Sequence, residues 1–127
     1  MKNKIWMGIT TVSSAKEGEL IAKNLITNNL AACVNIIPKI SSFFYWQGKF
    51  CGEKEFLLLI KTTGERVKKA MNKIKEGHSY QVPEILFWPV GEVDKDYWQW
   101  VKDTTTIQRK RIKKSPAKIA QKLNIKE

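Results

Sequence analysis

The stretch that decides the fold is "SSFFYWQGKFCGEKEFLLLIKT", residues 41–62, in which two apolar runs flank a glycine-containing segment. Aromatic and aliphatic residues of this kind are typical of strands, and Gly48 and Gly52 indicate turn material around "QGKFCGE". The stretch therefore predicts a long β-hairpin. Upstream, "LAACVNIIP" leads into the same strand, where Pro38 predicts an edge strand, a bulge or a bend because proline cannot donate to a sheet.

The segment before the hairpin predicts a strand followed by a helix. Residues 4–12, "KIWMGITTV", are apolar and β-branched enough for a buried strand. Ser14 is placed to cap the helix, and Glu17, three residues on, is placed to reach back to that cap. Asn28 and Asn29 suit the end of this helix, because asparagine tolerates the left-handed conformation.

The segment after the hairpin repeats this pattern. Thr62 is expected to cap a second helix that stops at Gly77. Residues 84–90, "EILFWPV", predict a short strand, and Asp94 is expected to cap a last helix. The order strand, helix, strand, strand, helix, strand predicts an α+β chain with a ferredoxin-like βαββαβ antiparallel sheet, two helices on one face and an additional C-terminal helix.

The hairpin carries apolar side chains on both of its faces. Phe43 and Tyr45 alternate with Phe44 and Trp46, and residues 56–60, "FLLLI", have no polar side. Because an antiparallel sheet with one solvated face alternates apolar and polar residues, this pattern predicts that a neighbouring copy covers the second face. The alternative is that a C-terminal segment folds over it.

The bulk composition describes one globular domain with a basic end. The chain has 127 residues, of which 43% are hydrophobic and 28% charged, which excludes a disordered chain. No apolar run is long enough for a membrane span and no secretory signal is evident, so a cytoplasmic location and free thiols are expected. Residues 104–127 hold eight Lys or Arg and one Glu, so most of the net charge of +11 lies there. We therefore divide the chain into a domain, 1–104, and a basic extension, 105–127.

Five motifs together give the chain a family resemblance. They are "AACVNI" (Ala31–Ile36), "YWQGK" (Tyr45–Lys49), "LLLIKTT" (Leu57–Thr63), "HSYQVPEI" (His78–Ile85) and "DYWQWV" (Asp96–Val101). In this order and at this spacing they resemble the CutA divalent-cation tolerance family, over roughly residues 4–104. The resemblance implies a homotrimer of ferredoxin-like protomers with hairpins pairing across subunits, kinship in fold with trimeric nitrogen-regulatory proteins, and a role in copper and other divalent-metal tolerance.

Two positions depart from the family pattern. Ser79 stands where the family usually has proline, which predicts a looser backbone beside His78 because proline fixes φ. Gln81 stands where the family often has glutamate, and an amide is a poorer ligand for a hard cation than a carboxylate. We therefore expect a less rigid motif around His78, the only histidine in the chain, and a weaker ligand at position 81.

The resemblance places His78 and Glu84 near a cleft between subunits and makes them candidate metal ligands, with Cys33 as a third candidate. Imidazole and thiolate suit Cu²⁺ or Zn²⁺, and a carboxylate broadens the choice. The spacing of these residues is not a ligand motif, and a lone histidine after a helix equally suits a capping or packing role. No organic cofactor is expected.

Other functions compete with metal binding. Cys33 and His78 are types found in nucleophile–base pairs, but no flanking signature accompanies them and no phosphate loop or His-Glu-x-x-His motif appears, so we expect no enzyme. A small anionic ligand in the cleft, near Lys61 and Tyr80, is a second alternative drawn from fold analogy. Non-specific binding of polyanions through "RKRIKK", residues 109–114, is a third.

Overall fold

The computed structural model describes residues 4–106. Its elements are β1 (Ile5–Val12), α1 (Ala15–Thr27), β2 (Cys33–Trp46), β3 (Lys49–Thr63), a 3-10 turn η1 (Gly64–Arg66), α2 (Val67–Gly77), β4 (Ile85–Pro89) and α3 (Lys95–Thr106). The basic cluster at 109–114 lies outside the described residues, so polyanion binding stays a prediction. The division at residue 104 also stays a prediction, and α3 continues past it through Thr106.

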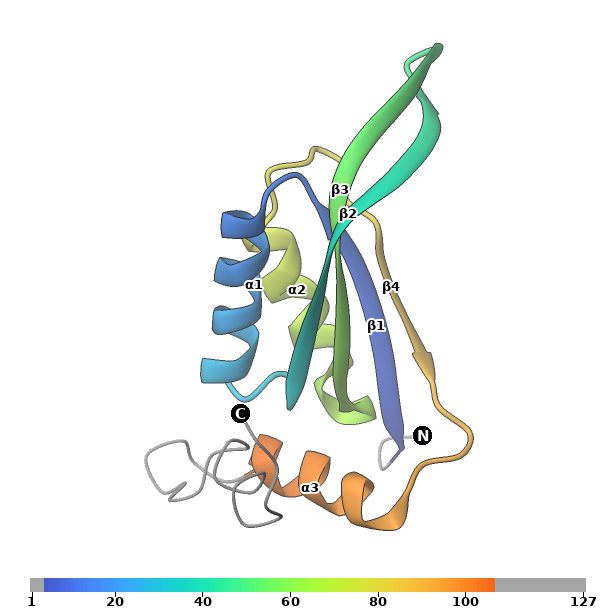
Figure 1. Cartoon of the computed structure of the whole chain (residues 1–127). Coiled ribbons are helices and arrows are strands. Elements are labelled where there is room, and N and C mark those ends of the chain that lie inside the picture. The colour runs from blue at the N-terminus through green and yellow to red at the C-terminus, as the bar shows by residue number, and fades with distance from the viewer. Residues whose placement is uncertain (1–3, 107–127) are drawn as a thin grey trace, which may run out of the picture.

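The four strands form one sheet in the order β2-β3-β1-β4, with every neighbouring pair antiparallel. Figure 1 shows α1 and α2 together on one face of this sheet and α3 across its end. The main core lies between the two helices and the sheet; its buried residues are Val12, Ile21, Leu25, Leu30, Ala31, Leu58, Ile60, Ala70 and Ile74. The predicted α+β arrangement is therefore confirmed.

Two of the three predicted helix caps are present. The Glu17 N–H donates to Ser14 Oγ at 3.1 Å, and the Tyr97 N–H donates to Asp94 Oδ2 at 3.0 Å. The Thr62 cap is wrong. Thr62 is buried in β3, where its hydroxyl donates to the Leu30 carbonyl at 2.7 Å, because pairing with β1 extends β3 through Thr63.

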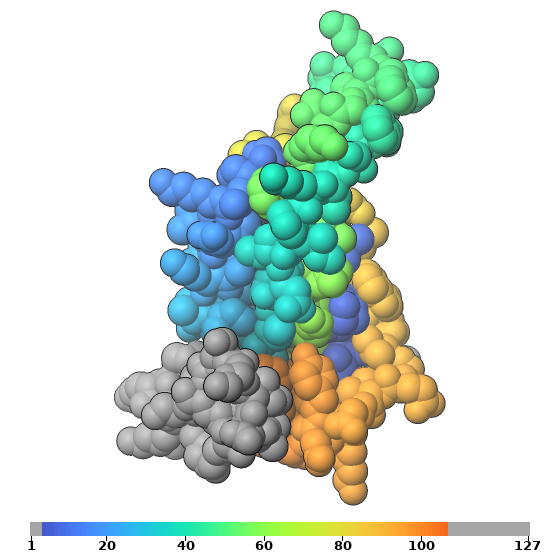
Figure 2. Space-filling view, in the orientation of Figure 1, coloured from blue at the N-terminus to red at the C-terminus, as the bar shows by residue number. Residues whose placement is uncertain are grey.

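The hairpin bends at the predicted proline. β2 is an edge strand, and its register with β3 shifts by one residue between Ile37 and Ile40. This is a β-bulge, in which Lys39 has a φ of 59°. The turn itself is only Gln47–Gly48, both with positive φ, so the predicted turn segment was too long. Beyond the bulge the hairpin tip projects away from the helices, as Figures 1 and 2 show.

Large apolar side chains remain uncovered in two places. At the tip, the exposed fractions are 69% for Phe43, 74% for Tyr45 and 66% for Phe50. On the sheet face opposite α1 and α2, Leu86 is 51% and Trp88 is 42% exposed. The last described helix, α3, packs its Val101 against Ile5 and Ala32 at the end of the sheet, so it leaves this face open.

Candidate functional site

The His78 imidazole is fully buried behind the loop that leads into β4. His78 follows α2 as its C-terminal cap residue. Its Nε2 lies 3.1 Å from Thr10 Oγ1 on β1, and its Nδ1 accepts a hydrogen bond from the Tyr80 N–H at 3.3 Å. Since Nδ1 is an acceptor, the proton belongs on Nε2, which donates to Thr10. Both ring nitrogens are therefore engaged by groups of the same chain.

The neighbouring Ser79 is held by α1. Its N–H donates to Glu17 Oε2 at 2.7 Å and its hydroxyl donates to Glu17 Oε1 at 3.0 Å. The Glu17 carboxylate thus serves this loop instead of completing the predicted capping box. Proline has no N–H to donate, so serine adds an anchor here that proline could not supply. The looser backbone expected from Ser79 stays a prediction.

Tyr80 and Glu55 form a polar contact at the base of the hairpin tip. The Tyr80 hydroxyl donates to Glu55 Oε2 at 2.5 Å, and Glu55 is only 5% exposed. Burial raises the pKa of the Tyr80 phenol well above its usual range, and so do the hydrogen bond to Glu55 and the negative charges of Glu55, Glu17 and Glu53. The neutral Tyr80 phenol is therefore the hydrogen-bond donor to the Glu55 carboxylate.

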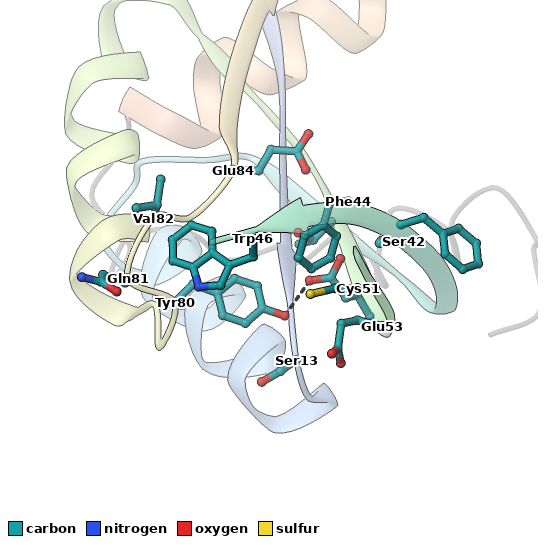
Figure 3. Close-up of a pocket in the computed structure, with 13 residues that line it drawn as sticks. Ser13, Ser42, Phe44, Trp46, Cys51, Glu53, Tyr80, Gln81, Val82 and Glu84 are labelled. Carbon is teal, nitrogen blue, oxygen red and sulfur yellow. Dashed lines mark hydrogen bonds between the residues drawn. The ribbon is translucent and has the colours of Figure 1, made fainter. Parts of the chain in front are cut away.

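A cavity of about 630 Å³ opens beside this contact, on the sheet face away from the helices. We call it the hairpin pocket; its lining residues are Thr11, Ser13, Ser42, Phe43, Phe44, Trp46, Cys51, Glu53, Glu55, Tyr80, Gln81, Val82 and Glu84. Figure 3 shows Phe44, Cys51 and Glu53 from the hairpin facing Tyr80 from the loop, and Trp46 at the end of β2 also lines this space. The lining includes three glutamates and neither Lys nor Arg among the described residues.

The bulge explains why these side chains meet. Because Ile40 pairs with Glu55 after the register shift, even-numbered residues of β2 share a face with odd-numbered residues of β3. Trp46 and Phe44 are thereby brought to the same side as Glu53 and Glu55. Our sequence reasoning missed these glutamates, although the alternation of Cys51, Glu53 and Glu55 in a predicted strand places all three on one face.

The structure does not bring the three predicted metal ligands together within one protomer. Glu84 lines the hairpin pocket, whereas His78 lies behind its wall. On β3, Cys33 is paired with Lys61, whereas Thr10, the partner of His78, is paired with Leu58. At ~3.3 Å per residue, these two positions are about 10 Å apart along the strand. Burial raises the pKa of Tyr97 on α3, and so, to a smaller extent, does an electrostatic interaction with Cys33, so Cys33 belongs to the α3 end of the sheet.

The cysteine that shares the pocket with Glu84 is Cys51. Within residues 4–106 of a single chain, no three His, Cys, Asp or Glu side chains are grouped so as to hold a metal ion. Lys61, expected near Tyr80 in the anion alternative, bonds to Asn35 instead. It lies six residues along β3 from Glu55, the partner of Tyr80, which is roughly 20 Å in a strand.

The fold and the pocket define a class: an α+β protein with a split βαβ sheet, a protruding hairpin and an acidic, aromatic-walled cavity beside it. Residues 6–104 match the family model described as "CutA1 divalent ion tolerance protein". The chain belongs to this family, which confirms the resemblance seen in its motifs. The family is named for tolerance of divalent ions and not for a reaction.

Named relatives agree with this assignment. The divalent-cation tolerance protein CutA of Thermus thermophilus is 40% identical over 97 residues, which cover 76% of this chain and 94% of the relative. The crystal structure of the divalent ion tolerance protein CutA1 from Ehrlichia chaffeensis aligns with a TM-score of 0.79 at 31% identity, covering 82% of this chain and 97% of that one. The structure of the periplasmic divalent cation tolerance protein CutA from Archaeoglobus fulgidus aligns with a TM-score of 0.77 at 38% identity. The alignment covers 80% of this chain and 98% of that one.

Among the described residues, no helix has the length and apolar character needed to cross a membrane. The Archaeoglobus relative is called periplasmic. A cytoplasmic location for this chain therefore stays a prediction.

Proposed function

We propose that this chain serves divalent-cation tolerance as a homotrimer that binds a divalent cation, Cu²⁺ or Zn²⁺, in the hairpin pocket. The observation that carries the proposal is one of charge. The whole chain has a net charge of +11, yet the described lining of the hairpin pocket brings in Glu53, Glu55 and Glu84 without a Lys or Arg. A cavity with carboxylates on several walls concentrates cations.

The donor types fit a divalent cation of intermediate hardness. Carboxylate oxygens from Glu53 and Glu84 and the thiol of Cys51 line the pocket, and Glu55 is held in place by Tyr80. Oxygen donors favour hard cations, and a thiolate shifts the preference toward zinc and copper. Since residues 4–106 of one chain hold no group of three such ligands, we propose that a second copy completes the coordination.

The ligand set expected from the resemblance, His78 with Glu84 and Cys33, is the alternative arrangement. It requires Cys33 from another copy of the chain, since Cys33 and His78 lie apart in one protomer. It also requires the imidazole to leave Thr10 and Tyr80. A small anion in the same cleft would need basic residues from another copy, because the described lining supplies none.

The trimer part of the proposal is supported by the uncovered apolar surface. Burying one large apolar side chain is worth about 1.5–3 kcal/mol, so Leu86, Trp88 and the tip aromatics favour association. Sedimentation equilibrium tests this directly. A mass three times the 14.7 kDa of the chain is expected, and a folded monomer at micromolar concentration would contradict it.

Calorimetric titration with ZnCl₂ and CuCl₂ tests the cation site. We expect Glu55→Gln and Glu84→Gln each to weaken binding by at least about tenfold, since losing even an outer-shell partner of a metal costs 10–100-fold. Glu19→Gln, on the exposed surface of α1, is the matched control and should bind like wild type. Equal affinity in all four proteins would rule out the hairpin pocket as the site.

A further inference from the structure

The buried His78 stands directly behind the wall of the hairpin pocket. From this geometry we infer that His78 is a positioning residue: as a neutral imidazole it holds Tyr80 against the pocket, and it does not bind the cation itself. This inference deepens the proposed function, because it assigns a role in the same site. It concerns the one residue that the family motif makes the most obvious metal ligand.

The first support is that the imidazole has no free nitrogen. A metal needs the unprotonated nitrogen of a neutral histidine. In His78 that nitrogen is Nδ1, and it already accepts from the Tyr80 N–H at 3.3 Å. The other nitrogen is 3.1 Å from Thr10 Oγ1, and the side chain has no exposed surface. To bind a metal ion, the imidazole would therefore have to break its hydrogen bonds to Thr10 and Tyr80 and leave its buried position.

The second support is that Tyr80 is fixed at three points. Its N–H is bound by His78, its ring centroid lies 5.0 Å from the imidazole centroid, and its hydroxyl donates to Glu55 at 2.5 Å. Figure 3 shows the Tyr80 ring reaching from the loop toward the hairpin, with this last bond dashed. The imidazole thus determines where the phenol, and through it the Glu55 carboxylate, stands in the pocket.

The third support comes from the remaining charged neighbour. Glu17 on α1 has an oxygen 3.6 Å from His78 Nδ1, but both of its oxygens accept from Ser79 at 2.7 and 3.0 Å. Glu17 Oε1 also accepts from the Ser13 hydroxyl at 3.3 Å, so the carboxylate is committed to serine donors and not to the imidazole. Residues 78, 79 and 80 are each anchored to a different element or side chain, which fixes the loop before any cation arrives.

Nitrogen-15 NMR of the wild-type protein tests the inference without a variant, because His78 is the only histidine. We expect one ring nitrogen to show a directly bonded proton, assigned to Nε2, and the other to be unprotonated. Both signals should keep their shifts when ZnCl₂ is added to saturation. Loss or a large shift of the Nδ1 signal on zinc addition would overturn the inference, and so would a proton on Nδ1.

Two isosteric variants separate positioning from simple packing. In His78→Asn the amide oxygen replaces Nδ1 and can still accept from the Tyr80 N–H, whereas in His78→Gln the amide replaces Nε2 and only the contact with Thr10 remains. We expect amide hydrogen exchange of Tyr80 to be at least about tenfold faster in His78→Gln than in His78→Asn. Zinc affinity should stay within about twofold of wild type in His78→Asn and fall about 3- to 10-fold in His78→Gln, the loss that one hydrogen bond accounts for.

Equal losses in both variants, or none in either, would overturn the positioning role. If wild-type protein binds no zinc, the proposed function fails, while the imidazole protonation and the Tyr80 exchange rates still test the role of His78. If neither variant folds, the wild-type NMR titration decides the question by itself.

Discussion

The base and the tip of the β2–β3 hairpin are built from similar residues but have opposite surroundings. At the base, Leu58 and Ile60 are fully buried beneath α1 and α2. At the tip, Phe43, Tyr45 and Phe50 stand mostly in solvent. Figure 2 shows the tip standing clear of the body of the molecule. The same strand pair therefore builds the core at one end and leaves large apolar side chains in solvent at the other.

The boundary between the two regions is the bulge at Pro38 and Lys39. Up to Ile37 the strands lie within reach of the helix layer, and after Ile40 they bend away from it. The bulge also brings Phe44 and Trp46 to the face of Glu53 and Glu55, where all four line the hairpin pocket. Apolar content alone therefore does not identify a core, because the bend in the strand decides which of its side chains the helices cover.

The largest expected effect is at the base. Leu58→Ala should lower the free energy of unfolding by about 2–5 kcal/mol, because it leaves a cavity among fully buried residues. Urea unfolding at two protein concentrations measures this loss, which should be the same at both. The matched control is Leu57→Ala, on the opposite face of the same strand, where another copy of the chain is expected to pack. Its loss of unfolding free energy should be smaller at the lower protein concentration than at the higher one.

A smaller effect, and one that depends on concentration, is expected at the tip. Phe50 is stacked on Phe43 at 6.1 Å between ring centroids and meets Tyr45 at 5.6 Å. Phe50→Ala should weaken association by about 1.5–3 kcal/mol for each side chain buried between copies. Sedimentation equilibrium over a dilution series should then show dissociation that wild type lacks. An unchanged mass across the series would mean that the tip does not mediate association.

The contact between the tip and the body adds a pH-dependent effect. The pKa of Tyr80 is raised in the folded state, mainly by burial and then by Glu55, so the neutral phenol contributes stability that is complete below the unfolded value of ~10. That stability is lost as the pH rises through the folded value. The free energy of unfolding of wild type should therefore fall more steeply above pH ~10 than that of Tyr80→Phe. Parallel curves for the two proteins would contradict the Tyr80–Glu55 contact.

The smallest expected effect is at the turn. Gln47 adopts a φ of 51° before Gly48 at 80°, the geometry for which Asn-Gly is preferred. Gln47→Asn should raise the free energy of unfolding by less than about 1 kcal/mol, since it relieves part of the ~1–2 kcal/mol that a left-handed residue costs. Thermal unfolding detects the change. A loss of stability would show that a side-chain contact of Gln47 contributes more free energy than the relief of its left-handed backbone.

The sequence by itself determined the elements and their order. The hairpin, the interruption at Pro38, the caps at Ser14 and Asp94 and the family motifs all depend on residues close in the chain, and short-range rules describe such features well. The uncovered second face also followed from the sequence, because a strand with apolar residues at every position has no side suited to water.

Only the tertiary structure decided which side chains meet. Thr62 became a strand residue because β1 pairs through Thr63, Cys51 and not Cys33 joined Glu84, and the His78 nitrogens turned inward to Thr10 and Tyr80. The physical reason is that these neighbours come from segments far apart in the chain, and even one extra residue at a bulge changes which side chains of paired strands share a face. Register is a property of paired strands, and no single segment of sequence contains it.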